Sequence, residues 1–264
     1  MLSKPGINSI LSRFSLDSQV AVVTGGAQGL GYAMAEALCS AGLKGIAVLD
    51  INESSGAFAA QALHLNYGTE ASFFKADVTD EPSLKAVFAA VDAKFGGIDI
   101  LVCSAGVVEN YSAEEYPYMR FQRVVNINLS GSFLCAQAVF PYMCNRGSGS
   151  IIFIGSMSGS IVNWPQCQIA YNASKAGVIH MMKSFAVEWA KYNIRCNSIS
   201  PGYMHTSLIE FADKDLIRKW LEATPMKRMG EPEELQGVVL WLASKASSYT
   251  TGADIAIDGG YTSL

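Results

Sequence analysis

The stretch Val20-Ala-Val-Val-Thr-Gly-Gly-Ala-Gln-Gly-Leu-Gly31 joins a short β-branched run to a glycine-rich turn. The residues that follow, 32–41, are rich in good helix formers and predict a helix. Glycines between a strand and a helix let the backbone approach a pyrophosphate, whose charge is favoured at the helix N-terminus. The stretch therefore predicts a dinucleotide-binding turn. Its expected contacts come from Gly25, Gln28, Gly29, Leu30 and Gly31.

A second strand, 46–49, ends in Asp50, followed by Ile51. The acid stands about twenty residues beyond the glycine turn, where a carboxylate accepts hydrogen bonds from the adenosine ribose and repels a 2′-phosphate. No arginine or lysine occupies 51–55. These features favour NAD over NADP, with Asp50 and Ile51 beside the ribose. An aspartate that only caps a helix or closes a turn is the alternative interpretation.

Strand-like and helix-like segments alternate along the rest of the chain, without a repeat or a linker. The pattern predicts an α/β fold with a single Rossmann-type domain over residues 19–264, preceded by an N-terminal arm, 1–18, outside the core. We expect a doubly wound parallel sheet of about seven strands with helices on both faces. The further strands are expected at 71–76, 98–102, 150–154, 195–199 and 254–258, and the helix after the fourth strand at 121–144.

Chemistry-bearing residues follow the ends of these strands. Right-handed crossovers bring the carboxyl ends of parallel strands to one edge of the sheet. Asp50, Asp77, the turn 103–106, Ser156 and the pair 201–202 all stand at such ends. Independent signals that meet at one edge indicate a single binding site.

Three polar residues in the stretch 156–175 suit proton transfer. Tyr171 and Lys175 are four residues apart and would share a helix face. An ammonium beside a phenol favours the phenolate, so Lys175 is expected to lower the pKa of Tyr171 towards neutrality. The Ser156 hydroxyl can bind a substrate oxygen. A tyrosine and a lysine on a solvated helix face are the alternative interpretation of the spacing alone.

Composition excludes several classes of function. The 264-residue chain has a formal net charge of −4 and no basic stripe, which argues against nucleic acid. No apolar run reaches the roughly 18 residues that a membrane helix needs. The six cysteines and three histidines are scattered, so neither a disulfide framework nor a metal site is expected. A cytoplasmic location follows from the cysteine usage, with a mitochondrial transit peptide in the short arm as the alternative.

Together these motifs resemble the short-chain dehydrogenase/reductase family over residues 19–263. The resemblance rests on Thr24–Gly31, Asp77-Val78, Asn128-Leu-Ser-Gly, Ser156, Tyr171-x-x-x-Lys175 and Pro201-Gly202. It implies a nicotinamide-dependent hydride transfer on a secondary alcohol and a homotetramer. It also implies a catalytic tetrad of Asn128, Ser156, Tyr171 and Lys175.

The resemblance assigns a role to each of these residues. Tyr171 would exchange a proton with the substrate oxygen that Ser156 holds, and Lys175 would bind the nicotinamide ribose. Asn128 would position a water that links Lys175 to solvent. The remaining cofactor contacts are assigned to Asp77 and Val78 at the adenine, Ala105 and Gly106 at the adenosine, and Pro201, Gly202 and Thr206 at the nicotinamide amide and phosphates.

Two departures from the family pattern stand out. The usual Asn-Asn-Ala-Gly after the fourth strand is Cys103-Ser104-Ala105-Gly106 here. The missing asparagine side chains leave their strand-bracing contacts in doubt. The gap between Ser156 and Tyr171 is longer than in many members, and the loop 161–169 should line the substrate pocket.

Longer segments narrow the expected substrate. The sequence around Ser156, around Tyr171 and near the C-terminus is similar to fungal and yeast polyol dehydrogenases, including ribulose-forming D-arabinitol 2-dehydrogenases. We therefore expect an NAD-linked sugar alcohol/ketose pair such as D-arabinitol/D-ribulose. A polyol pocket needs hydrogen-bonding side chains because buried hydroxyls are costly when unpaired. The candidates are Asn110, Ser158, Asn163, Gln166, Gln168 and His205, each of which could instead be a loop residue with a local partner.

Other functions stay open at this point. The first alternative is an NADPH-dependent carbonyl or ketose reductase of the sorbose or xylulose type. A regulatory dinucleotide-binding protein without turnover is the second, although it would not need Tyr171 and Lys175. An acyl-carrier-protein ketoreductase is the third, and it would require a basic patch near Tyr116 and Trp164, where the sequence offers little.

Overall fold

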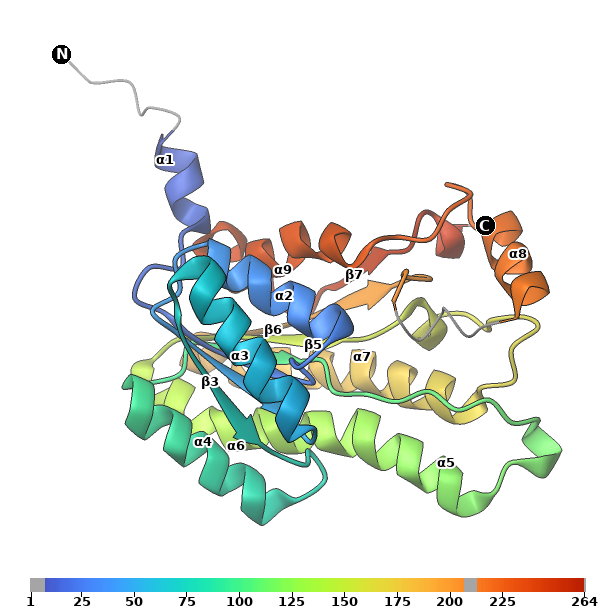
Figure 1. The fold of residues 1–264 in the computed structure, drawn as a ribbon, viewed down its shortest axis with the longest axis horizontal. Helices are drawn as coiled ribbons and strands as arrows, with labels where there is room; N and C mark the ends of the chain where they lie inside the picture. The colour runs from blue at the N-terminus through green and yellow to red at the C-terminus, as the bar shows by residue number, and fades with distance from the viewer. Residues whose placement is uncertain (1–7, 207–212, 264) are drawn as a thin grey trace.

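The computed structural model describes residues 8–206 and 213–263. Its centre is a seven-stranded parallel sheet in the order β3-β2-β1-β4-β5-β6-β7 (Figure 1), which confirms the expected fold class. The strands are β1 Val20–Thr24, β2 Gly45–Asp50, β3 Glu70–Lys75, β4 Ile100–Cys103, β5 Gly149–Ile154, β6 Ile194–Pro201 and β7 Asp254–Ile257.

Helices cover both faces of the sheet (Figure 1). One face carries α2 Gly29–Ser40, α3 Glu53–Tyr67 and α9 Gln236–Ala243. The other carries α4 Glu81–Phe95, α6 Gly131–Arg146 and α7 Ile169–Trp189. The shorter helices are α1 Asn8–Leu11, α5 Tyr118–Val125 and α8 Lys214–Ala223, and a π-helical turn, Asn126–Ser130, joins α5 to α6.

The sequence explains where these elements begin. The side chain of Asn52 accepts a hydrogen bond from the Ser55 amide at 3.1 Å, and Asp80 does the same for Ser83, so both helices start with a cap. The central strands are buried on both faces and are mostly apolar, with β1 reading Val-Ala-Val-Val-Thr. The edge strand β3 is less buried and carries charged residues at both ends.

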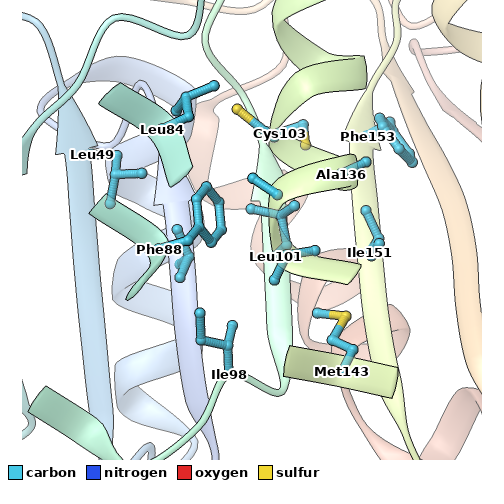
Figure 2. Close-up of a cluster of buried hydrophobic side chains, with 14 of the residues drawn as sticks. Leu49, Leu84, Phe88, Ile98, Leu101, Cys103, Ala136, Met143, Ile151 and Phe153 are labelled. Atoms are coloured by element: carbon cyan, nitrogen blue, oxygen red, sulfur yellow. The ribbon is translucent and has the colours of Figure 1, made fainter. Parts of the chain in front are cut away.

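The core consists of two layers, one on each side of the sheet. Figure 2 shows part of the layer under α4 and α6, where side chains from both helices lie against β2, β4 and β5. The labelled members are Leu49, Leu84, Phe88, Ile98, Leu101, Cys103, Ala136, Met143, Ile151 and Phe153. This packing fixes the strand ends, on which the site described below is built.

Element boundaries differ from the sequence expectations by a few residues at most. The third strand is 70–75 instead of 71–76, and the segment 118–146 is helical where 121–144 was expected. The N-terminal arm, 1–18, was expected to lie outside the core, but Leu16 is 0% exposed and packs among α2 and β2 residues. Its amide donates to the Ala41 carbonyl at 2.9 Å. Packing of the domain thus begins inside the expected arm.

The segment from α5 to α6, Tyr118–Arg146, is long and apolar enough to cross a membrane by length and composition alone. Cys135, Ala136 and Val139 in it are buried in the core layer against the sheet. One side of the segment is therefore packed in the core of the domain.

Candidate active site

A cleft of about 950 Å³ opens at the carboxyl edge of the sheet. It extends from the glycine turn, over the ends of β1, β4 and β5, to the segment after β6. Every residue predicted to contact the cofactor lines it. These residues are Gly25, Gln28, Gly29, Leu30, Gly31, Asp50, Ile51, Asp77, Val78, Ala105, Gly106, Tyr171, Lys175, Pro201, Gly202 and Thr206.

The glycine turn has the shape that a pyrophosphate requires. A Cβ on Gly25, whose φ is +64°, would lie 2.8 Å from the Ala105 Cα, and one on Gly31 would collide with the Gly25 carbonyl oxygen. Gly29 begins α2 with a φ of +56° and has no atom within 4 Å of its Cβ position. The turn is packed closely against the chain at Gly25 and Gly31 and is open at Gly29, where α2 begins and its backbone amides are available. The residues present therefore fit a dinucleotide.

Asp50 lies at the other side of this turn. Its carboxylate accepts hydrogen bonds from the Ala27 amide at 3.3 Å and from the Asn52 amide at 3.0 Å, and it also lines the cleft. Among the described lining residues the basic side chains are Arg123 and Lys175, and Arg123 pairs with Glu109 at 2.6 Å. Among the described residues the hydrogen-bond partners of the Asp50 carboxylate are these two backbone amides, and a carboxylate in this position suits an uncharged ribose better than a 2′-phosphate.

The turn after β4 is braced without the asparagines that its sequence lacks. The hydroxyl of Thr24 accepts hydrogen bonds from the amides of Ser104 and Ala105 at 3.1 and 3.2 Å. The Cys103 thiol is buried, 3.9 Å from the Ser132 carbonyl oxygen. A threonine of the neighbouring strand therefore supplies the bracing that the sequence left in doubt.

The proton-transfer groups stand together at the far end of the cleft. Ser156 follows β5, and Tyr171 and Lys175 lie one turn apart on α7. The Lys175 Nζ is 5.5 Å from the centre of the Tyr171 ring and donates a hydrogen bond to the Ile154 carbonyl at 2.7 Å. The spacing in the sequence thus places both side chains on the face that meets the cleft.

Burial controls the pKa values of this pair. It lowers the pKa of Lys175 from its usual range to about 8. It also raises the pKa of Tyr171, and a hydrogen bond with Ser156 offsets part of that increase. The expectation that Lys175 brings the pKa of Tyr171 below its ordinary value is therefore wrong, because loss of hydration outweighs the other effects.

Asn128 lies behind the cleft, on the π-helical turn, and is 1% exposed. Its side chain bonds the Val107 amide and carbonyl at 2.9 and 3.0 Å and donates to the Ser174 hydroxyl at 3.0 Å. A single π turn inside an α-helix often marks a functional site. The side chain of Asn128 thereby braces the turn after β4 against α7.

The residues predicted to bind substrate do not line the cleft. Asn110 is exposed, and His205 faces Glu231, with 3.4 Å between Nδ1 and Oε2. Four others form a hydrogen-bonded network among themselves: Ser158, Asn163, Gln166 and Gln168. Their polar groups already have partners, so the structure favours the local-partner interpretation that the sequence left open.

Other side chains line the cleft in their place. They come from the turn after β4 and from one face of α5 and the π turn: Val107, Val108, Met119, Gln122, Arg123 and Asn126. The spacing of 119, 122, 123 and 126 is that of one helix face, a signal that sequence analysis could have used. Without a fold, nothing in that spacing distinguishes this face from an exposed one.

Comparison with known proteins agrees with this geometry. The family described as enoyl-(acyl carrier protein) reductase matches residues 25–262. A short-chain type dehydrogenase/reductase from Mycobacterium marinum superposes with a TM-score of 0.93 at 41% identity, covering 97% of this chain and all of that one. An NAD⁺-bound xylitol dehydrogenase superposes with a TM-score of 0.87 at 32% identity, covering 93% and 99%.

Three curated relatives are similar along nearly the whole chain. A sorbose reductase of Candida albicans is 42% identical, over 97% of this chain and 91% of its own. A probable NADP-dependent mannitol dehydrogenase of Yarrowia lipolytica is 40% identical, over 96% and 91%. A ribulose-forming D-arabinitol 2-dehydrogenase of Scheffersomyces stipitis is 41% identical, over 96% and 97%.

These matches show the class of protein. The chain belongs to the short-chain dehydrogenase/reductase family. It is an NAD(P)-dependent oxidoreductase of that family, as the sequence predicted. Its relatives divide between NAD and NADP, so the family alone does not select the cofactor.

Proposed function

We propose that this protein interconverts a sugar alcohol and its ketose, with NAD as the favoured cofactor and D-arabinitol/D-ribulose as one candidate pair. The observation that carries the proposal is a single cleft with Asp50 at one end and the group Ser156, Tyr171 and Lys175 at the other. The reactions named for the sorbose, mannitol and arabinitol relatives support a polyol or ketose substrate.

The residues of this chain divide the work as follows. The glycine turn and Asp50 would hold the adenosine half of the cofactor, and Lys175 and Thr206 would hold its nicotinamide half. When bound, the nicotinamide supplies the site that accepts or gives the hydride. Ser156 donates a hydrogen bond to the reacting oxygen, and Tyr171 exchanges the proton with it.

The raised pKa of Tyr171 fixes the expected pH dependence. A phenol with a pKa above its ordinary value is protonated at neutral pH, so it is ready to act as the acid in ketose reduction. Oxidation needs the phenolate, whose population grows as pH rises. We therefore expect alcohol oxidation to accelerate through the alkaline range while reduction stays active near neutral pH.

An NADPH-dependent ketose reductase is the second candidate. The NADP-dependent mannitol dehydrogenase relative favours it. The absence of a basic side chain beside Asp50 in the described lining opposes it.

Initial rates test the proposal directly. NAD and NADP are each offered with D-arabinitol, xylitol, ribitol, sorbitol and mannitol at alkaline pH, and NADH and NADPH with the matching ketoses near pH 7. NAD-linked oxidation of one polyol, with reduction of its ketose, supports the proposal. Turnover of ketones with NADPH alone favours the second candidate, and no turnover of any polyol or ketose overturns both.

We also propose that the enzyme is a cytoplasmic homotetramer. Apolar side chains at exposed positions of α6 and α7 support association, with Phe133 39% and Val187 81% exposed. Free cysteines, of which Cys39 and Cys196 are buried, support a reducing compartment. Light scattering after size exclusion measures the mass against the 28.3 kDa chain, and cell fractionation tests the location.

A further inference from the structure

Gln168 is the centre of a buried hydrogen-bonded network beside the active site. It is 4% exposed and immediately precedes α7. Its amide nitrogen faces three oxygens, Ser158 Oγ at 3.2 Å, Asn163 Oδ1 at 3.0 Å and Asn172 Oδ1 at 2.9 Å. Its amide oxygen accepts from Gln166 Nε2 at 3.2 Å. The side chain therefore bonds residues on both sides of it along the chain.

One branch of this network leads to the catalytic serine. The amide of Ser158, whose hydroxyl bonds Gln168, donates to the Ser156 Oγ at 3.1 Å. Because the Ser156 oxygen accepts this hydrogen bond through a lone pair, its own O–H remains available to donate to another group. The Ser156 hydroxyl also lowers the pKa of Tyr171, which places the two side chains close to each other. The branch thus sets the direction in which Ser156 donates.

A second branch leads to the catalytic tyrosine. Asn172 follows Tyr171 directly, and its side chain bonds the Gln168 amide nitrogen. The Asn172 backbone amide also donates to the Gln168 carbonyl at 3.0 Å. Two contacts therefore fix the first turn of α7, which carries Tyr171, to the same glutamine.

A third branch fixes the glutamine itself to the segment after β6. Asn163, which is 1% exposed, donates to the Tyr203 hydroxyl at 3.3 Å, and that hydroxyl donates to Gln166 Oε1 at 2.6 Å. Tyr203 in turn stacks on Trp220 of α8, with 4.4 Å between ring centres. The network therefore rests on a packed aromatic pair instead of on solvent.

We propose that Gln168 is a positioning residue that sets the separation and orientation of Ser156 and Tyr171, through Ser158 on one side and Asn172 on the other. It does not line the cleft, so it acts through these residues and not on the cofactor or substrate. The inference rests on the proposed function to the extent that Ser156 and Tyr171 perform the chemistry.

The first test compares Gln168→Leu with Gln61→Leu, the same change at an exposed position of α3. We expect kcat for polyol oxidation to fall about 10- to 100-fold in Gln168→Leu, because small misplacements of catalytic groups have effects of this size. The Kd for NADH, followed by its fluorescence, should change by less than about twofold, since the glycine turn is untouched. Gln61→Leu should match the wild type.

A pH–rate profile separates positioning from simple structural support. Loss of the Ser156 hydrogen bond removes a contact that lowers the pKa of Tyr171, so the oxidation profile should shift to higher pH. Lys175, the charged group whose Nζ lies 5.5 Å from the ring, is unchanged in the variant. A Gln168→Leu enzyme with the wild-type kcat and profile would overturn the proposal, even if its melting temperature were lower.

Crystal structures test the proposal independently of activity. If the wild type turns over no polyol, the proposed function fails, yet the positions of Ser156 and Tyr171 can still be compared between wild type and Gln168→Leu. A rotated Ser156 or a wider Ser156–Tyr171 separation supports the inference, and superimposable side chains overturn it. If Gln168→Leu does not fold, Ser158→Ala and Asn172→Ala each break one branch. Wild-type kcat in both would also overturn it.

Discussion

The glycine turn after β1 and the loop that follows Ser156 are held in different ways. The glycine turn after β1 is built from backbone, since its fit depends on the lack of Cβ atoms at Gly25 and Gly31. The loop 156–168 is held by side chains that bond one another around Gln168. A turn that depends on its backbone can be recognised from a short sequence motif. A network of side chains forms only when the chain folds and brings its members together. The glycine turn lies at the end of the cleft that binds the cofactor, here called the binding end, and Ser156 lies at the end where the chemistry occurs, the reacting end. Substitutions at the binding end should therefore change cofactor affinity, and substitutions at the reacting end should change kcat.

The largest effect is expected at the reacting end. Tyr171→Phe removes the proton-transfer group, and kcat should fall about 10²- to 10⁴-fold. The Kd for NADH should stay within about twofold because the glycine turn is intact. Stopped-flow rates and fluorescence titration measure the two quantities. Retention of most activity would show that another group transfers the proton.

Lys175 tests the stability cost of the reacting end. Its folded pKa of about 8 lies below the usual 10.5. At pH 7 it is protonated in both the folded and unfolded states, so the cost of burying the ammonium is fully present. Between pH 8 and 10.5 the folded state loses the proton first, and the cost declines. A shift of one pKa unit corresponds to about 1.36 kcal/mol. Lys175→Met removes this cost and should therefore raise the free energy of unfolding by up to about 3 kcal/mol at pH 7.

Urea denaturation of wild type and Lys175→Met at several pH values measures this difference. It should shrink as the pH approaches 10.5. Lys183→Met, at an exposed position of α7, is the matched control and should show no such trend. A pH-independent difference would indicate that Lys175 contributes through packing alone.

Adding a methyl group at Gly31 should weaken cofactor binding without changing the catalytic step. Gly31→Ala places a Cβ against the Gly25 carbonyl, and relieving the clash should shift the turn at a cost of about 1–3 kcal/mol. The Kd for NADH should rise about tenfold or more, with kcat at saturating cofactor nearly unchanged. Gly237→Ala, where the new Cβ has no atom within 4 Å, is the control. A fall in kcat without weaker binding would contradict the division between the two ends.

The smallest effect concerns cofactor choice. Asp50→Ala should raise the KM for NAD about tenfold, the equivalent of one hydrogen-bonded contact, and lower the KM for NADP. Steady-state kinetics with both cofactors give the ratio. Glu53→Ala, an exposed acid outside the cleft lining, should leave the ratio unchanged. If Asp50→Ala also leaves it unchanged, the carboxylate acts only on the Ala27 and Asn52 amides.

The contrast between the two ends explains what could be predicted from the sequence. The strand–turn–helix signal at 20–41 is local, so the fold and the cofactor-side lining follow from it and from the positions of the strand ends. The sequence leaves Gln168 and Asn163 open as either substrate contacts or loop residues, because a polar residue looks the same in a sequence whether its partner is a ligand or a neighbour. The sequence does not predict the direction of the Tyr171 pKa shift, because burial is a property of the folded chain.

The order of the strands has a consequence for the timing of folding. Thr24 at the end of β1 pairs with Cys103 at the end of β4, although β2 and β3 are made first. The cleft takes lining residues from Gly25 through Thr206, so most of the chain must leave the ribosome before a dinucleotide can bind. Pairings this distant are slow to form. A dinucleotide that contacts the whole cleft therefore requires the assembled sheet, and its binding stabilises the folded state.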